Sequence, residues 1–498
     1  MTNEGRGVLS SQFVICHLPK RCLHPRRPVV NAFHCGFAAP GFLQVTEEPM
    51  LYPLPPQPDL PTSVAGQIAE DYERLKESWP SSLEDYILGR YRIDLTSEYG
   101  GIEIKNPFGK ASGQLSLATH QVQKDAESGL GFVVLKTVIA QNESGLQSMQ
   151  DWAIKETHMT VERIAGSNGQ EGWTVTWKGR GWHESFASYL GFFAEALSAA
   201  RDANTLVAPS CKYHLPMPGE KVWRTDEYAF TTAALLEVWK RHGPAQRPMP
   251  LEKDFSPTLA GSPRAAQMET IIEWLRSVPG LIRQAVEPGA VRVGLKIFNA
   301  MFDDEFQLEM LKVTHKLCDK PPDFLVYANR LFDPHRVYEG KQGVAYGGPD
   351  LSARNLRMLQ AWRAMACREG LPGPALPISG TGDICSGKMA VEYLLRGCSS
   401  FQMHTFFQLP DSEYGMKSGH KTQRGLHELL FHPTTGFVAW IVHMRQKLDW
   451  PESMNIKQMA EYCAAPENKV WTNKGIQEFK NPRMSKGGFL LEFLDSLN

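Results

Sequence analysis

The segment of residues 377–405, PISGTGDICSGKMAVEYLLRGCSSFQMHT, constrains the fold more than any other part of the chain. Residues 376–379 predict a short buried strand, and the glycine-rich turn GTG follows it directly. Ser386 is placed to cap a helix that Gly397 ends, and a second apolar strand covers residues 400–403. This order of strand, glycine turn, helix and strand is typical of the last units of a βα barrel, where two neighbouring loops bind a phosphate.

The same order fits any βαβ unit with a Gly-rich turn, so the segment alone leaves both interpretations open. It does not match the dinucleotide-binding pattern G-x-G-x-x-G, because Gly387 comes too late in the chain. A Rossmann fold is therefore not favoured.

The composition narrows the class of protein. The chain has 498 residues and a net charge of −1, so it favours neither nucleic acid nor a membrane surface as a partner. No apolar run approaches the ~20 residues that cross a bilayer. The nine cysteines form no C-x-x-C pair, which argues against a metal or iron–sulfur site and suits a reducing compartment.

Short apolar segments alternate with helical segments from residue 102 onward. The predicted strands are residues 102–104, 132–137, 206–209, 250–255, 291–298, 324–327, 375–379 and 400–403. The predicted helices between them are residues 192–201, 225–241, 267–278, 304–317, 351–366 and 388–395. Strands that are apolar throughout predict a parallel sheet covered by helices. Eight units predict an α/β fold, a (β/α)8 TIM barrel with an N-terminal extension, an insertion after the second strand and a C-terminal helical tail.

The predicted domain organisation surrounds this barrel. Residues 1–45 are basic and poor in acids, which predicts a disordered or targeting-like tail. Residues 46–100 predict a linker with a helix over residues 64–79, and the barrel occupies residues 101–450. The insertion at residues 143–185 contains a strand-like WTVTW sequence and the tryptophans Trp152, Trp173, Trp177 and Trp182. The C-terminal part supplies a closing helix, and residues 451–498 form an extension.

In a βα barrel the functional side chains come from the C-terminal ends of the strands. There the sequence places Ala111, Ser112, Gly113, Lys136, Thr137, Asp254, Ser256, Lys296, Asn329, Gly347, Gly348, Gly380, Gly382 and Thr405. The small residues after the first strand leave room for a flat ring, and the glycines of the last units can surround a phosphate.

Two lysines at strand ends, Lys136 and Lys296, point to an anionic ligand. A buried ammonium group is unfavourable without a counter-charge, so each lysine needs an anionic partner. Lys296 could stabilise negative charge on a bound cofactor ring, and the alternative for either lysine is an ion pair with an acid at the rim. Asn329 could hydrogen-bond a planar amide or carboxylate, or cap its own loop.

Several motifs occur in a specific order: NPFGKASG at residues 106–113, GFVVLKTV at 131–138, VGLKIF at 293–298, YGGPDLSARNLRMLQAW at 346–362 and the segment 377–405. Together they resemble the dihydroorotate dehydrogenase family, a group of FMN-dependent (β/α)8 oxidoreductases that includes the flavin barrel of dihydropyrimidine dehydrogenase. The resemblance covers about residues 105–408.

The resemblance implies FMN as the cofactor and assigns residues to it. Those implied to contact FMN are Ala111, Ser112, Gly113, Lys136, Thr137, Lys296, Gly347, Gly348, Gly380, Gly382 and Thr405. Those implied to bind substrate are Asn329, Lys136 and Thr258. In the family, a Cys or Ser after the fourth strand removes a proton while hydride passes to flavin N5. Ser256, in DFSPTLAG, stands there and is the implied base, with Lys296 as a second catalytic residue; the alternative is a Ser-Pro turn.

Some positions depart from the family pattern. The asparagine-containing M-G-L-P-N segment is replaced by ESFASYLGF, and Thr258 replaces a further asparagine. Asp383 and His404 stand where the family has glycines of the phosphate turns. These departures leave the substrate open.

Three functional hypotheses follow. The favoured one is an FMN-dependent dehydrogenase acting on a C–C bond beside a carbonyl, with dihydroorotate and pyrimidine biosynthesis as the default. The second is a flavin- or ligand-binding barrel without dehydrogenase activity. The third is a lyase or isomerase that uses Lys136 or Lys296 as a Schiff-base amine. The expected partners are a small-molecule substrate and a diffusible electron acceptor, with a homodimer as an open expectation. The expected location is the cytoplasm, or an organelle if the basic N-terminus is a targeting segment.

Overall fold

The computed structural model describes residues 54–155, 159–166, 169–177, 180–255, 264–299, 303–315, 320–338, 341–370, 376–468 and 470. The predicted tail at residues 1–45 therefore lies outside the described residues, as do Ser256, Thr258 and residues 471–498.

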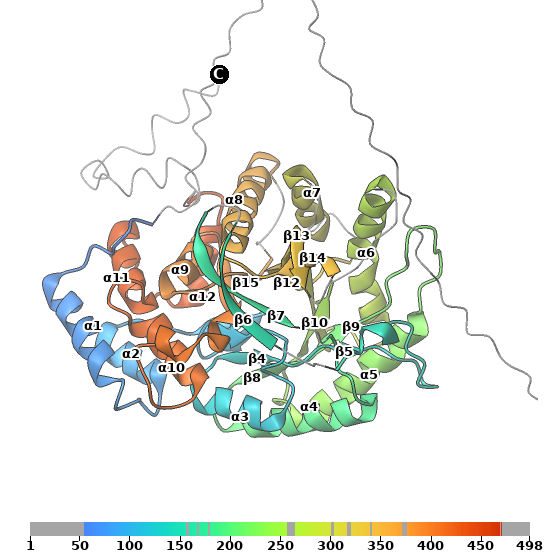
Figure 1. The fold of residues 1–498 in the computed structure, drawn as a ribbon, viewed down its shortest axis with the longest axis horizontal. Helices are drawn as coiled ribbons and strands as arrows, with labels where there is room; N and C mark the ends of the chain where they lie inside the picture. Colours follow the sequence, from blue (N-terminus) through green and yellow to red (C-terminus); the bar gives the residue numbers. More distant parts are fainter. Residues whose placement is uncertain are drawn as a thin grey trace, which may run out of the picture. The chain divides into compact units, whose positions relative to one another are not determined.

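A 10-stranded parallel sheet is the centre of this unit. In the order in which they pair, its strands are β5 (Val138–Ile139), β9 (Ser210–Lys212), β10 (Met249–Asp254), β11 (Val291–Phe298), β12 (Phe324–Asn329), β15 (Ile378–Thr381), β16 (Cys398–Met403), β3 (Phe108–Lys110), β4 (Phe132–Val134) and β8 (Leu206–Ala208). The sheet curls, and helices surround it, as in a TIM-barrel-like fold (Figure 1). The predicted α/β class with a parallel sheet is confirmed.

The helices predicted between the strands are present. They are α4 (Phe186–Arg201), α5 (Thr225–His242), α6 (Arg264–Gln284), α7 (Asp304–Thr314), α8 (Leu351–Arg368) and α9 (Gly387–Leu394), and α3 (Thr119–Glu127) precedes β4. Several boundaries differ from the predictions. The start of α4 lies six residues before the predicted residue 192, because the Ser185 hydroxyl accepts a hydrogen bond from the Ser188 N–H and caps the helix there. The predicted Ser386 cap of α9 is confirmed, since its hydroxyl accepts from the Met389 N–H at 3.1 Å.

Aromatic rings fill the interior of the sheet at the N-terminal ends of its strands. The Phe132 ring stacks on the Tyr99 ring with centroids 4.5 Å apart, and Phe324 meets Tyr99 edge-on at 4.9 Å. Gly109 and Gly294 make this possible, since a Cβ at either position would lie within 2.5 Å of the Phe132 or Phe324 ring. Glycine in these two strands is therefore a packing requirement.

The predicted position of the first strand in the parallel sheet is wrong. Residues 102–104 form β2 (Ile102–Ile104), which pairs antiparallel with β1 (Ser97–Tyr99) in a separate two-stranded sheet. The parallel sheet begins instead at β3, within the NPFGKASG motif. The apolar alternation of Ile102 and Ile104 fits either location, and only the position of Tyr99 inside the curled sheet distinguishes them.

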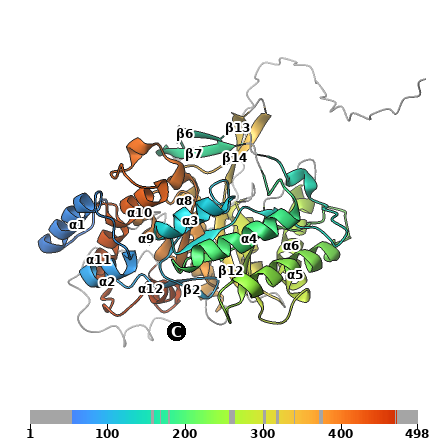
Figure 2. The same cartoon turned by 90° about the horizontal axis from the view of Figure 1, so that it is seen from below.

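Two antiparallel hairpins extend from the C-terminal edge of the sheet. The first, β6 (Met159–Ala165) with β7 (Glu171–Trp177), follows β5 and contains the predicted WTVTW strand. The second, β13 (Leu331–Tyr338) with β14 (Lys341–Tyr346), follows β12 and was not expected from its mixed polar sequence. β7 and β14 lie against each other, and Figure 2 shows the hairpins together on one side of the sheet.

Segments from both ends of the described chain pack together beside the sheet. They include α1 (Thr62–Arg74), α2 (Leu83–Tyr91), α10 (Lys421–Phe431), α11 (Phe437–Leu448) and α12 (Ile456–Ala464), with short 3-10 helices η1 (Gln150–Trp152), η2 (Thr405–Gln408) and η3 (Asp411–Glu413) elsewhere. The Tyr72 hydroxyl of α1 donates to Glu428 of α10 at 2.9 Å, and the Leu54 N–H donates to Glu392 of α9 at 3.0 Å. The C-terminal part was expected to supply one closing helix, but it forms three, α10, α11 and α12.

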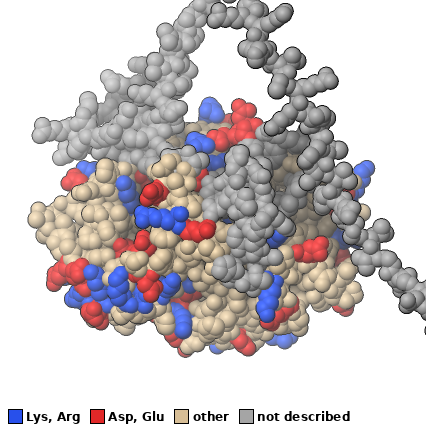
Figure 3. Space-filling model, viewed as in Figure 1, with Lys and Arg blue, Asp and Glu red and all other residues tan. Residues whose placement is uncertain are grey.

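Among the described residues visible in Figure 3, Lys and Arg are interspersed with Asp and Glu. Over the described ranges, no helix combines the length and the apolar character that a membrane crossing requires.

The close packing of α9 against α11 leaves no room for a side chain at Gly387. A Cβ there would lie 2.0 Å from the Phe437 backbone nitrogen and 2.3 Å from the Leu429 carbonyl oxygen. We expect Gly387→Ala to lower the free energy of unfolding by about 3 kcal/mol, because backbone atoms cannot rotate away. Urea unfolding followed by circular dichroism measures this change.

Gly89 provides the matched control. It lies on the exposed side of α2, and a Cβ there would meet nothing within 4 Å. Gly89→Ala should leave stability unchanged or raise it by up to about 1 kcal/mol, since alanine favours the helix. Equal effects of the two substitutions would contradict the packing described.

Candidate functional site

The C-terminal ends of the parallel strands bring most of the predicted site residues to one edge of the sheet, here called the mouth. Ala111, Ser112 and Gly113 follow β3, and Lys136 and Thr137 lie between β4 and β5. Lys296 lies near the end of β11, and Asn329 is the last residue of β12. The structure places these segments at one edge of the sheet, because the C-terminal ends of neighbouring parallel strands lie side by side.

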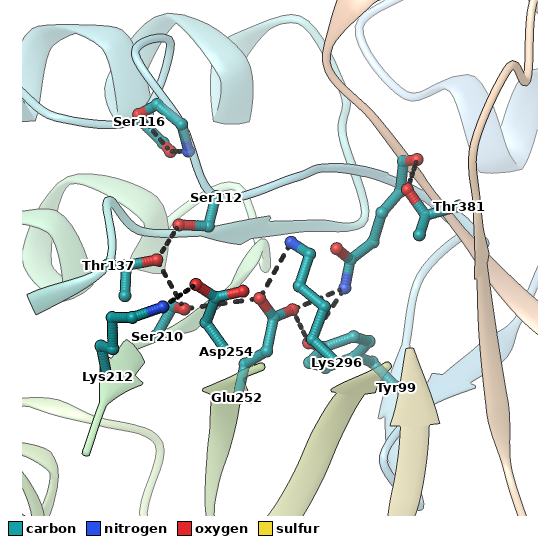
Figure 4. Close-up of polar contacts among 12 residues, drawn as sticks. Tyr99, Ser112, Ser116, Thr137, Ser210, Lys212, Glu252, Asp254, Lys296 and Thr381 are labelled. Carbon is teal, nitrogen blue, oxygen red and sulfur yellow. Dashed lines mark hydrogen bonds and ion pairs between the residues drawn. The ribbon is translucent and has the colours of Figure 1, made fainter. Parts of the chain in front are cut away.

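Lys296 has an internal counter-charge. Its Nζ lies 3.1 Å from Oε1 of Glu252 on the neighbouring strand β10, and both side chains are buried. Glu252 Oε2 also accepts hydrogen bonds from the Tyr99 hydroxyl at 3.1 Å and from Gln402 Nε2 at 3.0 Å (Figure 4). Glu252, which is not among the predicted site residues, therefore supplies the anionic partner that Lys296 was expected to need.

A line of hydroxyl groups connects this carboxylate to the first strand. The Ser112 and Thr137 hydroxyls are 2.9 Å apart, and the Thr137 and Ser210 hydroxyls are 3.0 Å apart. Ser210 donates to Glu252 Oε1 at 3.4 Å (Figure 4). A polar network thus spans neighbouring strands just below the mouth.

A second ion pair lies next to this network. Lys212, the last residue of β9, is 3.5 Å from Asp254 Oδ2 at the end of β10, and its ammonium lies 3.8 Å from the Trp152 ring centroid. Burial lowers the pKa of Lys212, although Asp254 counteracts this effect. Lys212 is not among the predicted site residues, because the predicted third strand ends at residue 209, whereas the chain rejoins the sheet as β9 after Pro209.

Lys253 is buried but faces away from the mouth. Its neighbour Glu252 points into the sheet interior, so Lys253 lies on the helix side, where it donates to the Asp254 carbonyl at 2.8 Å and the Tyr213 carbonyl at 3.4 Å. Burial, together with the positive charge of Lys212, lowers the pKa of Lys253 to about 7.

The predicted phosphate residues gather near η2. Gly382 follows β15 with φ of +108°, and a Cβ there would meet Asn355 and Leu351 of α8. A Cβ at Gly347 would lie 3.9 Å from the Thr405 hydroxyl, so these two segments are adjacent, and Gly348 lies three residues before Leu351, where α8 begins. Gly380 differs, because it is part of β15 and packs against the Tyr393 ring.

Asp383 and His404, which stand where the family resemblance predicts glycines, are both half-buried near these glycines. Burial raises the pKa of Asp383 to about 7, and nearby Asp350 adds to this, although the Ser352 hydroxyl donates to the carboxylate at 3.0 Å. The His404 ring packs on Gly113, where an added Cβ would lie 2.6 Å from its Cδ2 and Nε2. Burial lowers the pKa of His404 to about 3, and the positive charges of Arg330, Lys136, Lys110 and Lys296 lower it further.

The positive charges of Lys136, Lys296 and Arg330 all act on the His404 ring and lower its pKa. Ser256 and Thr258 lie outside the described residues. The Asn329 carbonyl accepts from the Asn299 N–H at 3.0 Å, so the residue that follows β11 fixes its backbone.

Neither a protein-family model nor a curated protein sequence matches this chain.

Asp383 gives a pH-dependent prediction. Its folded pKa of about 7 lies above the value of 3.8 for a solvated carboxyl, so the folded state loses stability as the pH rises from about 4 to about 7. We expect Asp383→Asn to abolish this loss, so that the variant gains stability over the native chain between pH 5 and pH 8. Urea unfolding at several pH values measures the difference.

Asp449→Asn is the matched control, because it removes one carboxylate from a position with the same left-handed backbone conformation. Asp449 is exposed and has φ of +52°, close to the +51° of Asp383, so asparagine fits both positions. Asp449→Asn should change stability equally at pH 5 and pH 8. A gain for Asp383→Asn that is the same at both pH values would disprove the raised pKa.

Proposed function

We propose that this chain is an FMN-dependent oxidoreductase that resembles the dihydroorotate dehydrogenase family. Its substrate would be a small planar molecule, with dihydroorotate and a role in pyrimidine biosynthesis as the default. A diffusible acceptor would take the electrons. The proposal depends on the family resemblance of the motifs, on the topology of the sheet and on the charges at its mouth.

We also propose that the sheet is a closed (β/α)8 barrel. β8 and β9 are separated only by Pro209, and β4 and β5 only by residues 135–137. β4 pairs with β8 while β5 pairs with β9, so these four strands behave as two long strands of a closed ring. Counted this way the sheet has eight strands, which supports the predicted barrel.

The positive side chains gathered at the mouth are the observation that carries the functional proposal. Lys296 and Lys212 lie there in ion pairs with Glu252 and Asp254, and the charges of Lys136 and Arg330 act on nearby His404. Burial and the charge of Arg180 keep the pKa of Arg330 near 10 despite the attraction of Asp254, so it stays protonated at neutral pH. A group of cations at one place favours the binding of an anionic ligand.

The residues present fit FMN in charge and in backbone shape. The adjacency of Gly347 and Thr405 leaves main-chain groups without bulky side chains near the Gly382 turn, as a phosphate needs. A ring lying on Gly113 requires the His404 side chain to rotate away from it. Asp383 fits a phosphate when it is protonated, which its raised pKa allows near neutral pH.

Bound FMN would supply the site that accepts or donates hydride. The chain's own residues would hold the ligands: Lys136 and Lys296 by charge, Ala111, Ser112 and Gly113 by surface, and Asn329 and Thr258 by hydrogen bonds to the substrate. Ser256 would move the proton that accompanies hydride transfer. The hairpin β6–β7, with its tryptophans, would exclude water from this reaction.

Flavin content tests the cofactor directly. We expect the purified protein, or the protein reconstituted with FMN, to show a flavin spectrum at about one FMN per chain. Lys136→Met should weaken FMN binding by about tenfold or more, because it removes one mouth cation while keeping the chain length. Fluorescence titration with FMN measures the affinity.

Lys105→Met is the matched control. Lys105 precedes β3 at the opposite edge of the sheet, where its Nζ donates to the Ala203 carbonyl at 2.7 Å. Its loss should leave FMN affinity unchanged. Protein that stays colourless after FMN supplementation would refute the cofactor assignment.

The proposed base gives a separate prediction. Ser256→Ala should slow reduction of the bound flavin by dihydroorotate about 100-fold or more, because general-base catalysis contributes factors of this size. Flavin content should stay the same. Anaerobic stopped-flow spectroscopy measures the rate, and Ser277→Ala on the exposed face of α6 serves as the serine control. An unchanged rate would remove Ser256 from the mechanism.

A flavin- or ligand-binding barrel without dehydrogenase activity is the second candidate. The His404 ring on Gly113 favours it, because this ring covers part of the predicted flavin surface. A screen of small planar substrates for bleaching of the flavin without oxygen separates the two functions. FMN binding without bleaching by any of them supports the second.

A further inference from the structure

The polar network below the mouth follows the strands of the sheet in succession. Ser112 comes after β3, Thr137 lies between β4 and β5, Ser210 is on β9, Glu252 on β10 and Lys296 on β11. The successive contacts are 2.9 Å, 3.0 Å, 3.4 Å and 3.1 Å (Figure 4). We call Ser112, Thr137 and Ser210 the hydroxyl relay. It joins the surface predicted to carry a ligand to a buried ion pair.

Each hydroxyl of the relay can donate one hydrogen bond and accept others, so the relay has two directions. When Glu252 is a carboxylate, Ser210 must donate to it, Thr137 can donate to Ser210, and Ser112 can donate to Thr137. Ser112 then offers lone pairs to the mouth. When Glu252 is protonated, the three bonds reverse, and Ser112 offers its O–H to the mouth.

We propose that the hydroxyl relay conducts a proton between the mouth at Ser112 and the buried Glu252. A donor at the mouth gives a proton to Ser112, each hydroxyl passes its own proton to the next oxygen, and Glu252 gains one. No bond other than O–H bonds changes, and the relay itself ends with the same number of protons.

Proton transfer to Glu252 would change the charge balance around its carboxyl group. The groups that face the carboxyl are Lys296 from β11, Tyr99 from β1, Gln402 from β16 and Ser210 from β9. Protonation of Glu252 leaves the charge of Lys296 unbalanced at the mouth. The relay therefore couples proton uptake to binding of an anionic ligand, or to negative charge that develops on it.

The proposal rests on the proposed function only for the identity of that ligand. Glu252 is a positioning residue, because it acts on the mouth through Lys296 and Ser112. Ser210 is the best place to interrupt the relay, because its hydroxyl bridges Thr137 and Glu252. It is buried on β9, and it belongs to no predicted ligand contact.

The test uses the full chain without added ligand. A pH jump is followed by time-resolved infrared spectroscopy of the protonated-carboxyl band, which Glu252→Gln identifies by removing it. We expect Ser210→Ala and Thr137→Val each to slow protonation of Glu252 at least tenfold. Ser400→Ala should leave the rate unchanged, since Ser400 is equally buried on β16 and lies outside the relay.

The outcomes are decisive in each case. Slowed protonation in both relay variants with a normal rate in Ser400→Ala supports the proposal. An unchanged rate in Ser210→Ala overturns it, as does the absence at any pH of a band that Glu252→Gln removes. Colourless protein that still shows the slowed rates would reject FMN and keep the relay, whereas yellow protein with unchanged rates would do the reverse.

Discussion

The buried ion pair between Glu252 and Lys296 is the interaction around which the interior of this protein is arranged. Removing one partner of such a pair leaves an unbalanced charge and typically costs about 3–5 kcal/mol. Here the carboxylate is stabilised by three further donors, Tyr99, Gln402 and Ser210, from three other strands. The pair therefore links the strands to one another as well as balancing a charge.

The interior has two chemically distinct layers. At the N-terminal ends of the strands, Tyr99, Phe132 and Phe324 pack with aromatic contacts that glycines make possible. Above them, polar side chains replace apolar ones as the strands approach the mouth. Such a change of layer suits a fold that must be rigid at one end and bind a charged ligand at the other, because the apolar layer excludes water from beneath the polar network.

Much of the architecture was predictable from local sequence. The alternation of apolar strands and helices indicated the parallel sheet, and strand ends indicated where Ser112, Thr137, Lys296 and Asn329 would meet. Residue Ile102 shows the limit, because its apolar pattern fits either a hairpin or the first parallel strand. Lys212 and Glu252 show another, since a charged residue inside or just after a strand carries no sign of the partner that neutralises it.

The sequence by itself determined the order of the elements and the edge of the sheet where the predicted site residues lie, and its motifs are the source of the flavin hypothesis. Only the tertiary structure decided that Lys296 meets an acid of its own chain, that His404 lies on Gly113, and that Ser112 reaches Glu252 through two hydroxyls. The physical reason is distance along the chain. Periodicity and capping act between neighbours in sequence, whereas charge balance and hydrogen bonding in the interior join residues that only the curling of the sheet brings together.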